Sequence, residues 1–221
     1  MTYRSSVIAS NQTDIHHDLE TIVKKHLAKT YQKPFHEFSY PIFEKLNQYQ
    51  SELNKPIILD SGCGTGESSM RLARDFPNHC IIGIDQSAKR LERYIKQDNI
   101  FHSENLLLVR ADVVDIWRMA IQANWRIKKH FILYPNPWPK KNQIKRRWHG
   151  HPVFPEMIKL CEDIELRTNW KIYADEFRFA VELIIDTKAA IERIDLTEFV
   201  SPFEKKYFDS GHALYKLYFK L

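Results

Sequence analysis

The sequence predicts a three-layer α/β fold built on a mostly parallel sheet. Short apolar runs alternate along the chain with segments in which Leu, Ile or Met recur at helical spacing among charged residues. Continuous apolar strands separated by helices are typical of βαβ units, whose sheet is covered by helices on both faces. The last two strand-like segments, 190–196 and 213–221, are expected to be joined without a helix. They would pair as an antiparallel hairpin and give the sheet an antiparallel C-terminal edge.

The expected elements follow one another in a regular order. Two helices open the chain, at 14–31 and 35–50, where apolar residues recur on one face. The expected strands are the apolar runs 57–59, 81–84, 106–109 and 131–133, followed later by 165–168. The expected helices around them are 67–76, 87–98, 113–124, 153–163 and 171–186. We therefore expect an N-terminal helical extension over residues 1–50 and one α/β domain over residues 51–221.

Composition argues against several classes of protein. The chain has 221 residues, 43% of them hydrophobic and 28% charged, which is ordinary for a folded protein and atypical of a disordered one. No stretch approaches the roughly 20 apolar residues of a membrane span, and the N-terminus lacks the apolar core of a secretory signal. The three cysteines are far apart, without disulfide or metal-ligand spacing. These features predict a cytoplasmic protein without a resident metal.

A glycine-rich loop follows the first expected strand and precedes a helix. It reads Asp60-Ser61-Gly62-Cys63-Gly64-Thr65-Gly66. Glycines at this position let the backbone turn sharply and approach a ligand closely. A dinucleotide fingerprint needs glycine where Glu67 stands, and a phosphate-binding loop needs a Gly-Lys-Ser/Thr that the chain lacks. An acidic-x-G-x-G-x-G loop remains, which predicts binding of S-adenosylmethionine, a cofactor with an ammonium group and no phosphate.

Three carboxylates end successive strands of the expected sheet, where open α/β sheets bind ligands. Asp60 suits the cofactor's ammonium, and Asp85, which lies 19 residues after Gly66, can accept hydrogen bonds from both ribose hydroxyls. Asp112 can accept one from the adenine amino group. Taken alone, Asp60 or Asp112 is more often a helix N-cap or a turn residue. Cys63 is expected to be a small loop residue and not a nucleophile. The candidate cofactor-binding residues are Asp60, Gly62, Gly64, Gly66, Asp85, Asp112 and Asn136.

The segment after the fourth apolar run resembles a known family. It reads Pro135-Asn136-Pro137-Trp138-Pro139-Lys140-Lys141, followed by Lys145-Arg146-Arg147. The bacterial tRNA (guanine-N7)-methyltransferases carry P-D-P-W-P-K-K and then K-R-R at this position. Two later segments resemble the same family: Thr168-Asn169-Trp170 with Tyr173-Ala174, and Ser201-Pro202-Phe203-Glu204 with Gly211-His212. The resemblance extends from about residue 57 to the end of the chain.

The resemblance implies a Rossmann-like methyltransferase that transfers a methyl group from S-adenosylmethionine to N7 of a guanine in tRNA. Guanine N7 has a lone pair and no proton, so the enzyme mainly has to align the nucleophile, the methyl carbon and the sulfur. Asn136 is then the candidate catalytic residue, at the junction of cofactor and acceptor. The residues carried over to the acceptor side are Lys140, Arg146, Asn169, Ser201 and Glu204.

The chain also departs from the family pattern and leaves other reactions open. Asn136 and Asn169 stand where the pattern has aspartates, and Gln143 stands in place of a histidine. An asparagine keeps an acceptor oxygen but brings no charge and adds donors. Asn-Pro-Pro-aromatic segments at this strand end mark amino-group methyltransferases, so methylation of an amino or amide nitrogen on another RNA or a protein is the alternative reaction. A cofactor-binding and RNA-binding protein without catalysis is a third possibility.

The basic run beside this turn predicts an RNA partner. Five positive charges lie within residues 140–147, and Trp138 and Trp148 offer faces on which an unpaired base can stack. Seen alone, such a run is usually a solvated surface. The first helix adds Lys24, Lys25 and Lys29, as a second RNA contact or as its own solvated face. The neighbouring His16 and His17 cannot share one helix face and lack metal-ligand spacing. Nothing in the sequence indicates the oligomeric state.

Overall fold

The computed structural model describes residues 4–195 and 198–220. The chain divides into two compact units, each built from segments distant in sequence. The glycine-loop unit consists of residues 33–133 and 160–162. The turn unit consists of the described residues of 1–32, 134–159 and 163–221. Among the described residues, every helix is too short or too polar to span a membrane.

The glycine-loop unit is organised around five strands in the order β3-β4-β2-β1-β5. Their bounds are β1 (Ile57–Ser61), β2 (Cys80–Asp85), β3 (Ile100–Ser103), β4 (Leu106–Arg110) and β5 (Ile127–Leu133). β1 pairs with β2 and β5, and β2 pairs with β4, all in parallel, while β3 pairs with β4 antiparallel. β1 and β2 are buried along their whole length, which is why their sequences are continuous apolar runs.

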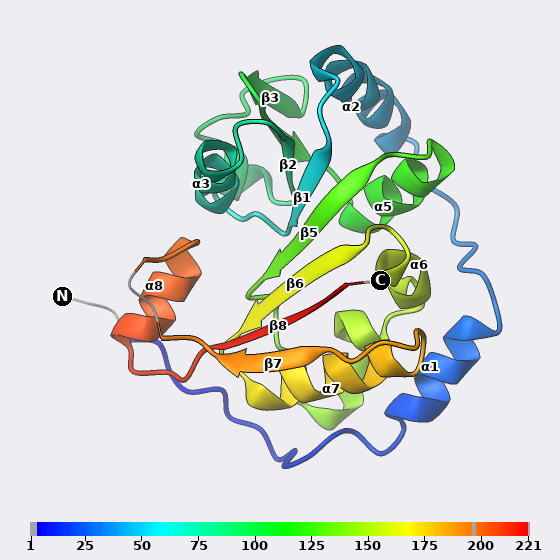
Figure 1. Ribbon diagram of the computed structural model, residues 1–221, viewed down its shortest axis with the longest axis vertical. Coiled ribbons are helices and arrows are strands. Elements are labelled where there is room, and N and C mark those ends of the chain that lie inside the picture. Colours follow the sequence, from blue (N-terminus) through cyan, green and yellow to red (C-terminus); the bar gives the residue numbers. More distant parts are fainter. Residues whose placement is uncertain (1–3, 196–197, 221) are drawn as a thin grey trace. The chain divides into compact units, whose positions relative to one another are not determined.

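Helices cover both faces of this sheet (Figure 1). Their bounds are α2 (Ser39–Leu53), α3 (Glu67–Asp75), α4 (Ala88–Leu91) and α5 (Val113–Gln122). α3 lies on one face, and α2 and α5, which pack together, lie on the other. α3 can approach β2 closely because Gly83 has no side chain: a Cβ there would lie 2.2 Å from the Ser69 hydroxyl. The missing side chain thus sets the position of the helix that follows the glycine loop.

The turn unit contains three strands in the order β6-β8-β7, and β8 pairs antiparallel with both β6 and β7. They are β6 (Asp163–Thr168), β7 (Ala190–Arg193) and β8 (Tyr215–Lys220). The helices are α1 (Leu19–Leu27), α6 (Phe154–Ile158), α7 (Lys171–Glu182) and α8 (Pro202–Asp209), with short 3-10 helices η1 (Lys141–Arg146) and η2 (Trp148–Gly150). α7 packs against all three strands and against α1 (Figure 1).

Most of the predicted elements are confirmed, and three predictions are wrong. The expected helix 153–163 forms only α6, which ends at Ile158. The expected helix 87–98 forms only α4, after which β3 appears as a short, half-exposed edge strand that the apolar periodicity did not predict. The last two strands do pair antiparallel, but α8 lies between them in sequence. The outermost residues predicted for these strands, Leu196 and Leu221, lie outside the described residues.

The first 50 residues are divided between the two compact units. α1 belongs to the turn unit and α2 to the glycine-loop unit, so the expected helical extension is shared between them. Pro41 is the third residue of α2, in the first turn, where its missing N–H has no helical acceptor to lose. Residues 1–3 of the expected extension lie outside the described residues.

Candidate functional site

The glycine loop connects β1 to α3 through three residues with positive φ. Gly62, Gly64 and Gly66 have φ angles of 78°, 60° and 83°, a region that costs other residues free energy. The N–H groups of Gly62 and Cys63 donate to the Ile84 carbonyl, at 2.7 and 3.0 Å. The end of β2 therefore holds the loop in place, and the backbone here is one that only glycine adopts readily.

Asp60 lies below this loop, at the end of β1, and is fully buried. Its Oδ2 accepts hydrogen bonds from the hydroxyls of Ser68 and Ser69 on α3, at 2.6 and 2.7 Å. Its other oxygen, Oδ1, is buried without a hydrogen-bond partner. Burial raises the pKa of this carboxyl, the two serine hydroxyls oppose the rise, and the charge of Asp85 adds to it. Buried acceptors without a donor are uncommon in folded proteins, which makes this oxygen a candidate acceptor for a ligand donor.

Asp85 ends β2 and holds the loop from the other side. Its Oδ2 accepts from the N–H of Gly64 at 3.0 Å and from the exposed Arg90 guanidinium at 3.3 Å. Its Oδ1 accepts from the N–H of Ser87 at 2.8 Å. Each carboxylate oxygen has two lone pairs, so Oδ1 keeps a site for a ligand hydroxyl and Oδ2 gains one when the exposed arginine moves away.

Asp112 follows β4 and is the N-cap of α5. Its Oδ1 accepts from the N–H groups of Val114 and Asp115, at 2.8 and 3.2 Å. The capping role considered for this residue is therefore confirmed, and its partly exposed carboxylate keeps Oδ2 for a further hydrogen bond. Cys63 is buried and free. Burial, then the charges of Asp60 and Asp85, raise the pKa of its thiol well above the usual value, which opposes a nucleophilic role.

The turn unit includes residues 134–138, a segment that directly follows β5 in sequence and that we call the acceptor turn. Both of its end residues have left-handed backbones, with φ angles of 51° at Tyr134 and 46° at Trp138. Such conformations are uncommon for bulky residues and persist only where the surroundings enforce them. Asn136, at the centre, is exposed, and its Oδ1 lies 3.5 Å from the N–H of Trp138.

The first end of the acceptor turn is fixed by Tyr134. Its N–H donates to the Arg167 carbonyl at 2.8 Å, and its hydroxyl donates to Glu204 at 2.9 Å. Glu204 is fully buried and also accepts from the Arg167 guanidinium at 2.9 Å and from the N–H of Val200 at 2.8 Å. Burial, followed by the charge of Glu204, raises the pKa of Tyr134, so its hydroxyl stays protonated and remains a donor.

The second end is fixed by Arg147. Its Nε and Nη2 both donate to the Trp138 carbonyl, at 3.1 and 3.0 Å, and its side chain is fully buried. The expectation that all five positive charges of the basic run face RNA is therefore wrong for this residue. Lys140, Lys141, Lys145 and Arg146 are exposed, and the Arg146 guanidinium lies 4.8 Å from the centre of the Trp138 ring.

The other residues predicted for the acceptor side have defined local roles. Ser201 is the N-cap of α8, and its hydroxyl accepts from the N–H of Glu204 at 3.2 Å. Asn169, half-buried, contacts His212 through Nδ2 and Nδ1, 2.9 Å apart. A direct contact of Glu204 with a guanine edge stays a prediction, since the carboxylate now serves three internal donors.

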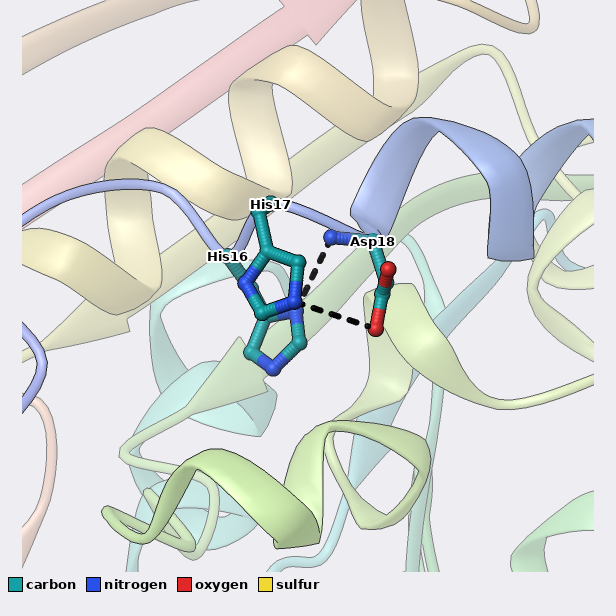
Figure 2. A group of neighbouring side chains, drawn as sticks. All are labelled: His16, His17 and Asp18. Carbon is teal, nitrogen blue, oxygen red and sulfur yellow. Dashed lines mark hydrogen bonds and ion pairs between the residues drawn. The ribbon is translucent and has the colours of Figure 1, made fainter.

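Three neighbouring side chains before α1 bring potential metal ligands together (Figure 2). The rings of His16 and His17 are stacked, with centroids 4.6 Å apart. Nδ1 of His16 accepts from the N–H of Asp18 at 3.1 Å, and Nε2 of His17 lies 3.4 Å from the Asp18 carboxylate. Residues adjacent in sequence account for these contacts, and we assign no metal to them.

Comparison with known proteins places the chain in a family. The Methyltransf_4 family, described as "Putative methyltransferase", matches residues 54–217, which include the glycine loop, the acceptor turn and α8. The chain belongs to this family. The membership confirms that the chain is a methyltransferase, as predicted.

Curated relatives of this Methyltransf_4 member carry a more specific name. A tRNA (guanine-N(7)-)-methyltransferase of Neisseria gonorrhoeae (strain NCCP11945) is 30% identical over 126 residues, which are 56% of this chain and 52% of that protein. One of Buchnera aphidicola subsp. Acyrthosiphon pisum (strain Tuc7) is 27% identical over 175 residues, 75% of this chain and 72% of that protein. The chain thus spans about half the length of the first of these relatives.

Solved structures confirm the predicted Rossmann-like methyltransferase fold. An antibiotic-related methyltransferase superposes with a TM-score of 0.58 over 87% of this chain and 97% of its own, at 16% identity. The 16S rRNA methyltransferase KamB superposes with a TM-score of 0.57 over 86% and 95%, at 15% identity. At such low identity the likeness concerns the fold.

Sequence reasoning missed the buried polar cluster that supports the acceptor turn. Arg147, Glu176 and His149 are all fully buried. In the sequence, Arg147 stands in a Lys-Arg-Arg run that is typical of a solvated surface, and Glu176 stands in an ordinary amphipathic helix. No local pattern separates these two residues from their exposed neighbours, because their burial arises only when α7, η2 and the N-terminal segment pack together.

Proposed function

We propose that this protein transfers a methyl group from S-adenosylmethionine to N7 of a guanine in tRNA. The observation that carries the proposal is the acceptor turn, whose exposed Asn136 follows the strand β5 in a chain similar to proteins named tRNA (guanine-N(7)-)-methyltransferase. The fold and the family are those of methyltransferases. The residues of the two units supply what the cofactor and the acceptor each need.

The cofactor side is built from the glycine-loop unit. S-adenosylmethionine, when bound, supplies an electrophilic methyl group on a sulfonium sulfur. The unpartnered Oδ1 of Asp60 and the positive-φ loop fit the ammonium-bearing end of this cofactor, which brings donors and needs a close backbone approach. Asp85 is the candidate for the ribose hydroxyls and Asp112, through Oδ2, for the adenine amino group. Gly62, Gly64 and Gly66 shape the loop, and Asn136 is the further candidate contact.

The acceptor side requires alignment and no general base. Guanine N7 presents a lone pair and carries no proton, so the reaction gains most from holding that lone pair in line with the methyl group. Asn136 is exposed at the centre of a turn fixed at both ends, and its amide can accept a hydrogen bond from a guanine N–H. Asn169, Ser201 and Glu204 complete the proposed acceptor side, Glu204 through its hold on Tyr134 as well.

The proposed RNA contacts are the exposed cations beside the acceptor turn. Lys140 and Arg146 lead this group, and Arg146 over the Trp138 ring forms a charged and aromatic surface. α1 packs against η2, which in turn packs against η1. The pKa of His26 on α1 is lowered by burial, raised in part by its hydrogen bond with the Gly150 backbone, and lowered further by the charges of Lys25 and Lys145. We therefore include the basic residues of α1 in the proposed RNA surface. Action on tRNA makes the cytoplasm the expected location.

Methyl transfer with labelled cofactor tests the proposal. The purified chain is incubated with radioactive S-adenosylmethionine and either tRNA from a strain that lacks its own N7 enzyme or total protein from that strain. Label in 7-methylguanosine, with tRNA chains that break after borohydride and aniline treatment, is the expected result. Label in other nucleosides or in protein would contradict guanine N7 as the acceptor.

A second reaction is favoured by one specific observation, the identity of residue 136. An exposed asparagine beside prolines can accept hydrogen bonds from a planar NH₂ group through its own carbonyl. Methylation of an amino or amide nitrogen on another RNA or on a protein is therefore the alternative. The same experiment separates it, because its label appears in a methylated amino nucleoside or in protein. Cofactor binding without label in either pool would indicate a binding protein without catalysis.

A further inference from the structure

We propose that Arg147 is a positioning residue that sets the acceptor turn for methyl transfer, through a buried polar cluster that also includes Glu176, His149 and Gln12. This role rests on the proposed function for its reaction, although the geometry of the cluster stands by itself. Three features support this role: the hydrogen bonds of the guanidinium, the carboxylate that neutralises its buried charge, and the backbone carbonyl to which it donates.

Four of the five N–H groups of the Arg147 guanidinium donate hydrogen bonds, and three acceptors receive them. Nε and Nη2 donate to the Trp138 carbonyl, Nη2 also donates to Oε1 of Gln12 at 3.0 Å, and Nη1 donates to Glu176 at 2.5 Å. The guanidinium also lies 4.8 Å from the centre of the Trp170 ring. The planar fork spans two sides of the site at once, which the single nitrogen of a lysine cannot do.

The carboxylate of Glu176 neutralises the buried positive charge of Arg147, and both of its oxygens accept hydrogen bonds. Its Oε2 accepts from Arg147 and from Nε2 of His149 at 2.8 Å, and its Oε1 accepts from Gln12 at 2.5 Å and from the N–H of His16 at 3.0 Å. Four donors converge on one carboxylate in the interior of the turn unit. Nδ1 of His149, on the far side of its ring, is buried without a hydrogen-bond partner, so the satisfied part of the cluster is the carboxylate itself. A buried carboxylate that is held by four donors fixes the side chains around it in one arrangement, and this fixes the position of Arg147.

What Arg147 holds is the strained end of the acceptor turn. Trp138 has a φ of 46°, a conformation that a tryptophan keeps only under outside constraint. Two hydrogen bonds to its carbonyl supply that constraint, and Arg146 contacts its ring. Asn136 lies two residues earlier and shares the turn through its contact with the Trp138 N–H. A shift of the Trp138 carbonyl is therefore a shift of the Asn136 amide.

The N-terminal segment adds a second hold on the same turn. The hydroxyl of Ser10 donates to the Pro139 carbonyl at 2.6 Å and accepts from the N–H of Gln12. Gln12 in turn bridges Glu176 and Arg147. Two successive carbonyls, those of Trp138 and Pro139, are thus held by one connected network. This arrangement separates Arg147 from the exposed cations: its charge orders the protein and does not meet RNA phosphates.

Arg147→Lys in the full chain is the test variant, because lysine keeps the charge beside Glu176 and loses the reach to Trp138. Ile158→Val, which shortens a fully buried side chain of α6 in the same unit, is the control for loss of stability. Each protein is assayed at the same interval below its own Tm. We expect Arg147→Lys to lower kcat for tRNA methylation by about 10-fold or more, while KM for tRNA and Kd for S-adenosylmethionine stay within about two-fold. Ile158→Val should leave kcat within about two-fold.

Limited proteolysis measures the conformation of the acceptor turn without relying on catalysis. Under native conditions, trypsin should cleave after Lys140 and Lys141 about five-fold faster in Arg147→Lys than in Ile158→Val at matched stability, because the turn opens locally. Unchanged kcat and unchanged cleavage would overturn the positioning role, as would a loss of kcat that Ile158→Val reproduces. If Arg147→Lys does not fold, Arg147→Met with Glu176→Met removes both buried charges together and undergoes the same measurements.

The two proposals fail in different ways. If the unaltered protein gives no 7-methylguanosine, the proposed function is wrong, and the cleavage rates still decide whether Arg147 holds the turn. If the unaltered protein methylates tRNA and Arg147→Lys does so equally fast, the proposed function stands and the positioning role is wrong.

Discussion

Asn136 differs by one functional group from the aspartate of the pattern P-D-P-W that its surroundings resemble. Its amide keeps an acceptor oxygen, but it brings no negative charge to offset the charge that develops on an attacking guanine. The side chain is exposed, and its contact with the Trp138 N–H uses the oxygen. A carboxylate at this position can make the same contact, so the two residues differ in chemistry and hardly in packing.

Asn136→Asp therefore separates the two candidate reactions. If guanine N7 is the acceptor, the added charge should raise kcat for tRNA methylation, by about 10-fold if it acts at a developing positive charge. If an amino nitrogen is the acceptor, a charged residue in place of the amide should lower kcat. The Tm should stay within a few degrees in both cases, because residue 136 is exposed. The measurement is single-turnover methyl transfer with identification of the nucleoside.

Asp85 is the carboxylate on which the proposed cofactor contact most depends. Asp85→Ala should abolish binding of S-adenosylmethionine in calorimetry, since it removes the ribose acceptor and also the partner of the Gly64 N–H. Asp75→Ala, at the exposed end of α3, is the control and should bind the cofactor normally. Normal binding by Asp85→Ala would contradict the assigned ribose contact.

At the scale of elements, α7 carries both a packing face and a buried ion pair. The helix packs on β6, β7 and β8, and Glu176 points from it into the cluster with Arg147. Burial alone would raise the pKa of Glu176, but the hydrogen bond and charge of His149 and the charge of Arg147 outweigh it and lower the pKa to about 2. The folded state therefore favours the ionised carboxylate more than the unfolded chain does.

The sign of the resulting pH dependence follows from this lowered pKa. Stability from Glu176 is fully present above its unfolded pKa near 4.5 and is lost as the pH falls towards 2. Glu176→Gln should cost about 3 kcal/mol at pH 7 and flatten the loss of stability between about pH 5 and 3. Denaturant unfolding at several pH values measures both effects. His149, whose pKa is lowered by burial, should still cause a loss below about pH 6.5.

Glu182→Gln is the matched control for this prediction. It makes the same substitution at the exposed last residue of the same helix. Its unfolding free energy should stay within about 0.5 kcal/mol of the unaltered protein at every pH. An equal effect of both variants would show that the acid sensitivity arises from helix charge and not from the buried pair.

Elements with a strong local signal were predictable, and those made by packing were not. β1, β2 and β4 are buried apolar runs between turn residues, so periodicity found them. β3 was missed because its four residues are half-exposed and gain their structure from pairing with β4. α8 was missed although its start carries a helix signal: Ser201 as N-cap, Pro202 at the first position and Glu204 at the third.

At the scale of the whole molecule, the distribution of charge is the property on which the proposed RNA binding depends most. The formal net charge is only +5, but the exposed cations of η1 and α1 gather in the turn unit. The sequence predicted the glycine loop and the acceptor turn because their backbone demands are local. It could not distinguish Arg147 from Arg146, since a guanidinium in a Lys-Arg-Arg run is buried or exposed according to residues from distant parts of the chain.

Salt dependence provides the test at this scale. The double variant Lys140→Glu with Arg146→Glu should weaken tRNA binding at least about 10-fold and reduce the slope of log K against log salt by about 1 for each phosphate that is no longer neutralised. Binding of S-adenosylmethionine should not change. Lys159→Glu with Lys188→Glu changes the net charge equally at exposed positions of the same unit and should alter tRNA binding far less. Equal losses in both double variants would place the RNA surface elsewhere.

The contacts that fix the two ends of the acceptor turn must also form in a certain order while the chain is being synthesised. The hydroxyl of Tyr134 can donate to Glu204 only after another 70 residues have been synthesised. Arg147 can contact Gln12 as soon as it emerges, because Gln12 was synthesised 135 residues earlier. At ribosomal speed the first delay lasts on the order of several seconds, during which the nascent chain already carries Asn136 while the Tyr134 hydroxyl still lacks its acceptor. We expect ribosome-bound chains that expose residues up to 195 to be cut by trypsin beside Lys140 faster than chains that expose residues beyond 210. The enzyme would thus stay incompetent towards RNA beside the ribosome until its last helix had left the exit tunnel.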